Sequence, residues 1–348
     1  MKRILAILFL AALTAHVGAQ QPVEGTTYYL PQTCLRFSVL VEKTTFQPGE
    51  LARYAERYMK LPVNDAPDTN YRIVGISMSL YAMPDTSRQF QAIIDRKHTV
   101  ISLERDENGV LKAVNAKGRS VAQPEPFRPA RKPHALNPRD YMTEDILASG
   151  SSAKMAELIA REIYDIRDSR NMLSRGEADF MPKDGEQLKI MLDNLNTQEH
   201  ALLQEFAGTT ETDTTQHFID FVPAKEVQDQ VLFRFSKKLG MVDSDDLAGI
   251  PYYINIKDLH AIPELKYDNE EAAKKSKEDI GINVTLPGKI QITVSDGRHP
   301  VASFETYAAQ FGRVEPLSAN LWSKKFITRL VLNPVTGTVE SLQTEPLE

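Results

Sequence analysis

Leu35-Arg36-Phe37-Ser38-Val39-Leu40-Val41-Glu42 is the stretch of this sequence that decides the fold. Its odd positions are all apolar and its even positions are mostly polar, which is the period of a strand with one buried face. The same alternation recurs at 74–80 and again at 290–295, near the other end of the chain. The sequence therefore predicts a β-rich protein whose strands each bury one face against a core.

Residues 26–118 surround this stretch, and we interpret them as an N-terminal β-rich domain with one short helix. The helix is predicted over 50–60, where apolar residues fall on one stripe and charged residues lie elsewhere. Two strands are predicted at 101–103 and 110–114. The pair Asn108-Gly109 lies between them and is a strong hairpin turn signal.

The middle of the chain changes character twice. Prolines crowd residues 119–149, and proline removes backbone donors and resists both helix and central strand. We interpret this segment as a Pro-rich linker; a ligand for a proline-recognising module is the functional alternative. Residues 150–208 repeat apolar side chains at helical spacing, with a break at Gly176 and Pro182. This pattern predicts two helices that form an αα-hairpin.

Residues 209–348 return to short strands, which favours a sandwich-like C-terminal domain. The sequence Asn333-Pro334-Val335-Thr336-Gly337 predicts a hairpin turn before the last strand. The charged stretch 268–279 is predicted to be a loop or a short helix. The predicted fold class is α+β, mostly β, with two β-rich parts and an intervening αα-hairpin. The clearest predicted strands cover 218–222, 231–236, 251–257, 289–295, 301–306 and 325–332.

The N-terminus indicates export. Met1-Lys2-Arg3 is a short cationic start, Ile4 to Ala15 is apolar, and Val17-Gly18-Ala19 places small residues at cleavage spacing. This predicts a signal peptide at residues 1–19, because the apolar run is too short to cross about 30 Å of hydrocarbon. No other apolar stretch approaches spanning length, so we expect no transmembrane anchor. Gln20, not a cysteine, comes directly after the expected cleavage point, so we expect no lipid anchor either. The mature protein is expected to be periplasmic or extracellular.

Composition excludes some partners. The 348 residues are 42% hydrophobic and 25% charged, which is typical of a globular protein. The formal net charge is −6, and a net anion lacks the cations that displace counterions from nucleic acid. Cys34 is the single cysteine, so neither an intrachain disulfide nor a cysteine zinc site is expected. Its thiol could be a nucleophile or pair with a partner, but a small buried strand residue is the favoured interpretation.

Two sequences resemble metal sites, and each lacks a required residue. Asn196-Thr197-Gln198-Glu199-His200 resembles an inverted zincin motif without its first histidine, so Glu199 and His200 are expected on the polar face of a helix. Asp243, Asp245 and Asp246 fail the spacing of an EF-hand loop. An irregular cation site could still use these three carboxylates, but a capped turn is the favoured interpretation.

Other catalytic signatures are also incomplete. Gly281 to Lys289 has the wrong glycine spacing for a phosphate loop, and the histidines outside the signal peptide are scattered. Carboxylate pairs for glycoside hydrolysis cannot be judged from sequence, because their separation is a three-dimensional property. Tyr28-Tyr29 or Tyr252-Tyr253 could contribute to an aromatic sugar platform. We therefore name no catalytic, cofactor-binding or metal-ligating residue, and we expect no cofactor.

Several segments together carry a family resemblance. They are Tyr28-Tyr29-Leu30-Pro31, residues 36–44, Pro48-Gly49-Glu50, residues 54–58, residues 233–236, residues 245–251 and residues 333–337. This combination resembles a family of exported proteins from anaerobic Gram-negative gut and oral bacteria, which is known as a domain of unknown function. The resemblance covers nearly the whole mature chain. It implies a Gram-negative envelope context and supplies no activity.

The favoured function is an exported, non-catalytic binding or scaffold protein of the bacterial envelope, with a protein or a glycan as partner. A hydrolase of envelope or dietary polymers is the first alternative, and it requires two carboxyl groups about 5–10 Å apart in a deep cleft. A periplasmic carrier of a small ligand is the second alternative, and it requires an enclosed apolar pocket. The sequence leaves the oligomeric state open.

Overall fold

The computed structural model describes residues 25–93, 98–132, 134–263 and 279–347. The predicted signal peptide lies outside these residues, as does the charged stretch 268–279 except for its last residue. Among these described residues 48% lie in strands and 22% in helices, which confirms the α+β, mostly β fold class. In the described part of the chain, no helix has both the length and the apolar character needed to cross a membrane.

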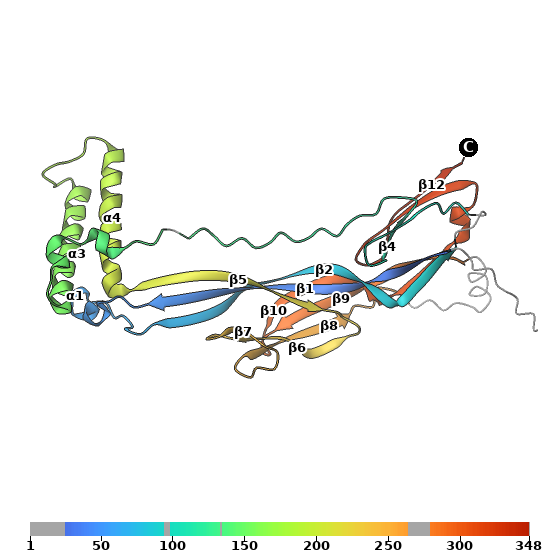
Figure 1. The fold of residues 1–348 in the computed structure, drawn as a ribbon, viewed down its shortest axis with the longest axis horizontal. Coiled ribbons are helices and arrows are strands. Elements are labelled where there is room, and N and C mark those ends of the chain that lie inside the picture. Colours follow the sequence, from blue (N-terminus) through green and yellow to red (C-terminus); the bar gives the residue numbers. More distant parts are fainter. Residues whose placement is uncertain (1–24, 94–97, 133, 264–278, 348) are drawn as a thin grey trace, which may run out of the picture.

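A three-stranded antiparallel sheet forms the long spine of the molecule (Figure 1). Its central strand β1 (Gly25–Gln47) pairs along nearly its whole length with β2 (Asp68–Ile93). On its other edge β1 pairs with β5 (Thr209–Phe221), a strand from the distant second β-rich part of the sequence. The two β-rich parts of the sequence thus share one sheet.

Strand β1 contributes to two hydrophobic cores. Its buried residues are even-numbered near the start of the strand and odd-numbered further along. Tyr28 and Leu30 pack into a cluster with the buried Trp322. The predicted alternation then holds, because all odd-numbered residues from 35 to 41 are buried in a second cluster. Residues 33–35 are all buried, so both faces of the strand are covered where the two cores meet.

A five-stranded antiparallel sheet packs on the spine and closes the second of these cores. Its order is β10-β9-β8-β6-β7. The even-numbered apolar residues at 290–294 are buried, as the predicted alternation requires. Its strands are β6 (Val227–Ser236), β7 (Gly240–Val242), β8 (Ile250–Asp258), β9 (Asp279–Ser295) and β10 (Pro300–Ser318).

A four-stranded sheet of order β12-β11-β4-β3 lies at the end of the spine that holds the C-terminus (Figure 1). The predicted turn at Asn108-Gly109 separates β3 from β4, and Gly109 has the positive φ of 84° that such a turn needs. β4 also pairs with β11, so this sheet again joins both ends of the sequence. Its strands are β3 (Leu103–Arg105), β4 (Leu111–Val114), β11 (Phe326–Leu332) and β12 (Val339–Pro346), and the 3-10 turn η3 (Ala319–Trp322) precedes β11.

A helical head occupies the opposite end of the spine (Figure 1). The predicted helix pair is confirmed as α3 (Ser152–Arg175) and α4 (Gly185–Ala207), which bury a shared cluster that contains Ile159, Ile163 and Phe206. The helix predicted at 50–60 is observed as η1 (Ala52–Tyr54) followed by α1 (Ala55–Met59). Two further short elements complete the head, η2 (Pro138–Tyr141) and α2 (Glu144–Leu147).

The Pro-rich segment, residues 119–137, runs from β4 to η2 and so connects the two ends of the molecule (Figure 1). It forms neither helix nor strand where it is described. It contacts the spine on the way, because the Phe127 N–H donates to Gln216 Oε1 at 3.3 Å and Lys132 Nζ lies 3.9 Å from an Asp213 oxygen. The remainder of the predicted linker, up to residue 149, contains η2 and α2.

Candidate functional site

The outer face of the five-stranded sheet carries the polar surface that we consider the candidate site. Ile254 and Ile256 of β8 point into the core, as do Ile290, Ile292 and Val294 of β9. The odd-numbered residues of both strands therefore point outward. The register sets Asn255 opposite Thr293 and Lys257 opposite Gln291. Polar groups of two neighbouring strands thus lie side by side on this face.

A β-bulge in β6 shapes this face. The pairing of β6 with β8 shifts register between Val227 and Gln230. Asp229, inside the bulge, has a φ of 50°, a left-handed conformation that is uncommon for residues other than glycine. Asn255 supports it: the Asp229 N–H donates to Asn255 Oδ1 at 2.8 Å, and Asn255 Nδ2 donates to Asp229 Oδ1 at 3.2 Å. Bulges of this kind re-aim side chains and interrupt pairing.

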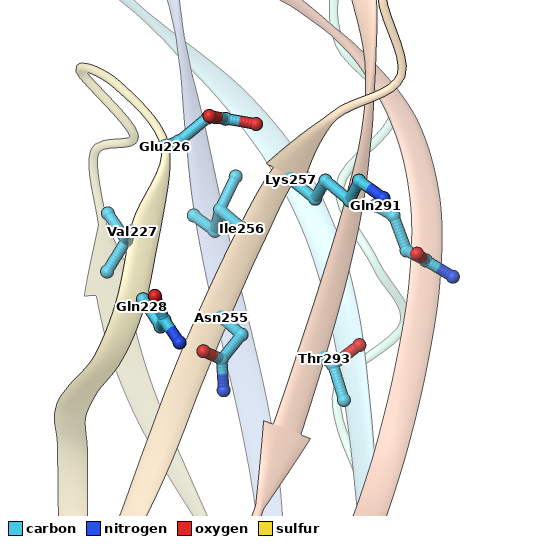
Figure 2. Close-up of a pocket in the computed structure, with 8 residues that line it drawn as sticks. All are labelled: Glu226, Val227, Gln228, Asn255, Ile256, Lys257, Gln291 and Thr293. Carbon is cyan, nitrogen blue, oxygen red and sulfur yellow. The ribbon is translucent and has the colours of Figure 1, made fainter.

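Next to the bulge lies a hollow of about 530 Å³, which we call the amide hollow (Figure 2). It is open to solvent on one side. Within the described chain, the side chains of Gln228, Gln291 and Thr293 make no hydrogen bond, so their polar groups are free for a ligand. The lining residues are Glu226, Val227, Gln228, Asn255, Ile256, Lys257, Gln291 and Thr293.

The charges of the amide hollow are balanced and sparse. Among the described residues that line it, Glu226 is the single carboxylate and Lys257 the single cation. One carboxylate oxygen of Glu226 already accepts a hydrogen bond from the Asp258 N–H at 2.8 Å. General acid–base hydrolysis of a glycoside uses two carboxyl groups that flank the bond. Among the described residues that line the amide hollow, Glu226 is the one carboxyl group of this kind.

A second hollow of about 440 Å³, the turn hollow, lies further along β8. Tyr253 contributes its ring, which packs beside Gly297 in the β9–β10 turn; a Cβ at Gly297 would lie 3.2 Å from a ring carbon of Tyr253. Hydrogen bonds from the backbone N–H groups of His299 and Arg298 hold the pKa of Asp296 below its usual value. The lining residues are Asp229, Pro251, Tyr253, Asp296, Gly297 and Arg298.

Four residues of the incomplete zincin motif line a hollow of about 560 Å³ beside α4: Asn196, Thr197, Glu199 and His200. Glu199 receives hydrogen bonds from Arg167 Nε at 2.6 Å and from Arg170, which also donates to Asn196 at 3.0 Å. Burial alone would raise the pKa of Glu199, but the two arginines outweigh burial and hold that pKa below its usual value. The carboxylate is therefore an ion-pair partner on the polar face of the helix.

An apolar hollow of about 470 Å³ lies between residues 261–263, the parts of β9 and β10 near Pro287 and Arg313, and the hairpin at 333–338. Leu286, Pro287 and Tyr307 contribute to its lining. Tyr307 is 52% exposed, so the hollow opens to solvent and is not the enclosed pocket that a small-ligand carrier requires.

The three predicted cation-binding candidates lie in the loop that follows β7. The Asp246 carboxylate accepts a hydrogen bond from the Ala248 N–H at 2.8 Å, and the Asp246 N–H donates to the Asp243 carbonyl at 3.1 Å. These contacts form a capped turn. Over the described residues, no three His, Cys, Asp or Glu side chains, Asp245 included, are grouped closely enough to hold a metal ion.

Cys34 and Tyr28, two further residues singled out from the sequence, are buried in the structure. Cys34 is a free, buried residue of β1, and burial raises the pKa of its thiol. Tyr28 is buried; its hydroxyl donates to the Gly281 carbonyl and accepts from the Asn283 N–H, both at 2.7 Å. Tyr253, from the second tyrosine pair considered for a sugar platform, lines the turn hollow.

The comparisons with known proteins place the chain in a family. Residues 24–340 match the family described as Domain of unknown function (DUF4831). Because this match covers most of the sequence, the chain belongs to that family. No curated protein and no solved structure matches the chain.

Proposed function

We propose that this protein is an exported, non-catalytic binding or scaffold protein of the bacterial envelope. Its ligand site is the amide hollow on the outer face of the five-stranded sheet. The observation that carries the proposal is the chemistry of this hollow: unpaired amide and hydroxyl groups surround one carboxylate that already accepts a backbone hydrogen bond. Such a site can recognise a polar ligand and lacks the second carboxyl group of a glycoside hydrolase.

The shape of the molecule supports the scaffold part of the proposal. β1 has 23 residues, so the strand alone spans about 75 Å at the usual rise per residue. It carries the helical head at one end and the four-stranded sheet at the other (Figure 1). The hollow lies on a sheet packed against the middle of this spine. A rigid spine can hold a bound ligand at a fixed distance from two further surfaces.

The sequence supports the export part of the proposal. The cationic start, the apolar run and the small residues at 17–19 predict a signal peptide. The test is fractionation of the producing bacterium followed by mass spectrometry of the mature N-terminus. We expect the protein in the periplasmic or extracellular fraction with residues 1–19 removed. Recovery of the uncleaved chain from the cytoplasm would contradict export.

The binding function is tested with envelopes of the producing bacterium. Purified mature protein is mixed with the envelopes and the bound fraction is measured by sedimentation. We expect saturable binding that Gln291→Ala weakens about tenfold. The matched control is Gln343→Ala, the same change at an exposed glutamine on β12, outside the hollow. Equal binding by both variants, or release of small fragments from the envelopes by the wild-type protein, would contradict the proposal.

A further inference from the structure

The candidate site has two parts in line along β8. The amide hollow lies at Asn255 and Lys257, and the turn hollow lies at Pro251 and Tyr253. The hydrogen-bonded pair of Asn255 and Asp229 separates them. Tyr253 and Lys257 are four residues apart on one face, so their Cα atoms are about 13 Å apart at the usual strand rise. A ligand that contacts both hollows must be extended.

We propose that the two hollows bind one extended, uncharged polysaccharide chain that lies along β8. This inference rests on the binding function proposed above and names the class of its ligand.

The first reason is the kind of hydrogen-bonding group on offer. A side-chain amide carries both donors and acceptors, and so does a hydroxyl group. The hydroxyl groups of a sugar likewise donate and accept. The unpaired side chains of Gln228, Gln291 and Thr293 therefore match the rim of a sugar ring without any change of protonation.

The second reason is the tyrosine in the turn hollow. Tyr253 presents an apolar ring with a polar end, a combination that suits a ligand with apolar faces and a wet rim. A sugar ring has such faces, formed by its C–H groups. Gly297 lies beside the ring and leaves room for it, because a Cβ at this position would lie 3.2 Å from a ring carbon of Tyr253.

The third reason is the balance of charge. The amide hollow holds Glu226 and Lys257, and the turn hollow holds Arg298 together with two aspartates. The carboxylate of Asp229 is bonded to Asn255, and that of Asp296 accepts backbone hydrogen bonds. Neither hollow has the surplus of cations that an anionic polymer would need. A protein partner would instead require an apolar centre, since interface cores are depleted of charged residues.

The test is a competition experiment on the binding of labelled mature protein to envelopes. One competitor is the soluble material released by proteinase K, and the other is the same material after sodium periodate has cleaved the vicinal diols of its sugars. We expect the proteinase digest to compete and the periodate-treated digest to lose at least 90% of its effect. If the proteinase K digest does not compete with the envelopes for the labelled protein, the partner is a protein. This outcome would overturn the glycan inference and leave the binding function standing. Absence of binding to untreated envelopes would instead overturn the binding function.

Chain length tests the two-part site. Envelope polysaccharide is separated by anion exchange, and the neutral fraction is partly hydrolysed and sized by gel filtration. We expect fragments long enough to reach both hollows to bind at least tenfold more tightly than the shortest fragments. Stronger binding of the acidic fraction, or affinity independent of length, would overturn the inference.

Point variants test whether the bound polysaccharide lies along β8. Tyr253→Ala is expected to weaken binding about tenfold, whereas Tyr253→Phe keeps the ring and is expected to bind within twofold of wild type. Tyr164→Ala is the matched control, because Tyr164 is a half-exposed tyrosine of the distant α3. Thermal unfolding of every variant distinguishes loss of the contact from loss of the fold. Full binding by a folded Tyr253→Ala variant would contradict the proposed path.

Discussion

Asn255 and Asp229 exchange two hydrogen bonds between β8 and β6, one in each direction, at 2.8 and 3.2 Å. The pair stabilises a residue with a φ of 50° and holds the bulge between the two hollows. A side chain on one strand thus sets the backbone of its neighbour, and the shape of the candidate site depends on it.

Asn255→Ala is expected to lower the free energy of unfolding by about 1–2 kcal/mol, because it removes both hydrogen bonds and leaves the left-handed residue unsupported. Urea unfolding followed by circular dichroism measures the loss. Lys257→Ala is the control, since Lys257 is an exposed neighbour on the same face without an ion-pair partner in the described chain. Its expected effect is within about 0.5 kcal/mol. Equal losses in both variants would show that the pair does not stabilise the bulge.

The sequence predicts which side chains of this site face away from the core, but it does not predict the bulge in β6 that shapes the site. The alternation at 290–295 predicts that Gln291 and Thr293 face away from the core, and they do. The bulge has no comparable signal, because residues 228–230 contain neither glycine nor a turn pair. Its support comes from Asn255, on another strand. Local patterns record which side of a strand is buried, whereas a bulge depends on a neighbour that lies elsewhere in the sequence.

The pairing of strands that are distant in the sequence is likewise not predicted by local patterns. The alternation at 35–42 predicts a half-buried strand, but nothing near it indicates that Arg36 lies opposite Asp220, with their side chains 2.7 Å apart. The pairing of β4 with β11 is equally remote in sequence. Sequence therefore predicts the α+β class and the helix pair, whose signals are local. It does not predict that both β-rich parts are joined along one spine.

Thr33 tests how firmly the spine is joined to its neighbours. Its buried hydroxyl donates to the Val335 carbonyl and accepts from the Ala309 N–H, both at 3.0 Å. Thr33→Val keeps the shape and removes both bonds, so it is expected to cost about 2–3 kcal/mol, because two buried backbone groups lose a partner. Thr44→Val, the same change on the same strand, is expected to stay within about 0.5 kcal/mol, since no hydrogen bond of the Thr44 side chain is present in the described structure. Similar losses from chemical denaturation of the two variants would argue against this role.

Glu199 gives the helical head a defined dependence on pH. Its pKa is lowered in the folded protein by Arg167 and Arg170, against the opposing effect of burial. The stabilisation is therefore complete above the pKa of an unfolded glutamate, about 4.3, and is lost as pH falls through the folded pKa. Glu199→Gln is expected to lower the free energy of unfolding by about 1–2 kcal/mol near neutral pH, after allowance for the part-exposed arginines. Thermal unfolding at pH 7 and at pH 3 measures the difference, which should shrink at the lower pH; a difference that stays constant would contradict the ion-pair explanation.

Glu205, on the same helix, is expected to behave in the opposite way. Burial raises its pKa, the charge of Glu50 adds to the shift, and Arg139 opposes it. The folded state therefore favours the protonated form, and stability decreases as pH rises from the unfolded pKa through the folded one. Glu205→Gln replaces the carboxylate with a neutral side chain of similar shape, so we expect Tm at pH 8 to increase by roughly 1–2 °C, the shift that about 1 kcal/mol produces in a chain of this length. The gain should shrink at pH 4, because the raised pKa favours the protonated form of wild-type Glu205 as pH falls. A decrease of Tm at pH 8, as expected for Glu199→Gln, would show that Glu205 has a stabilising partner in its ionised form.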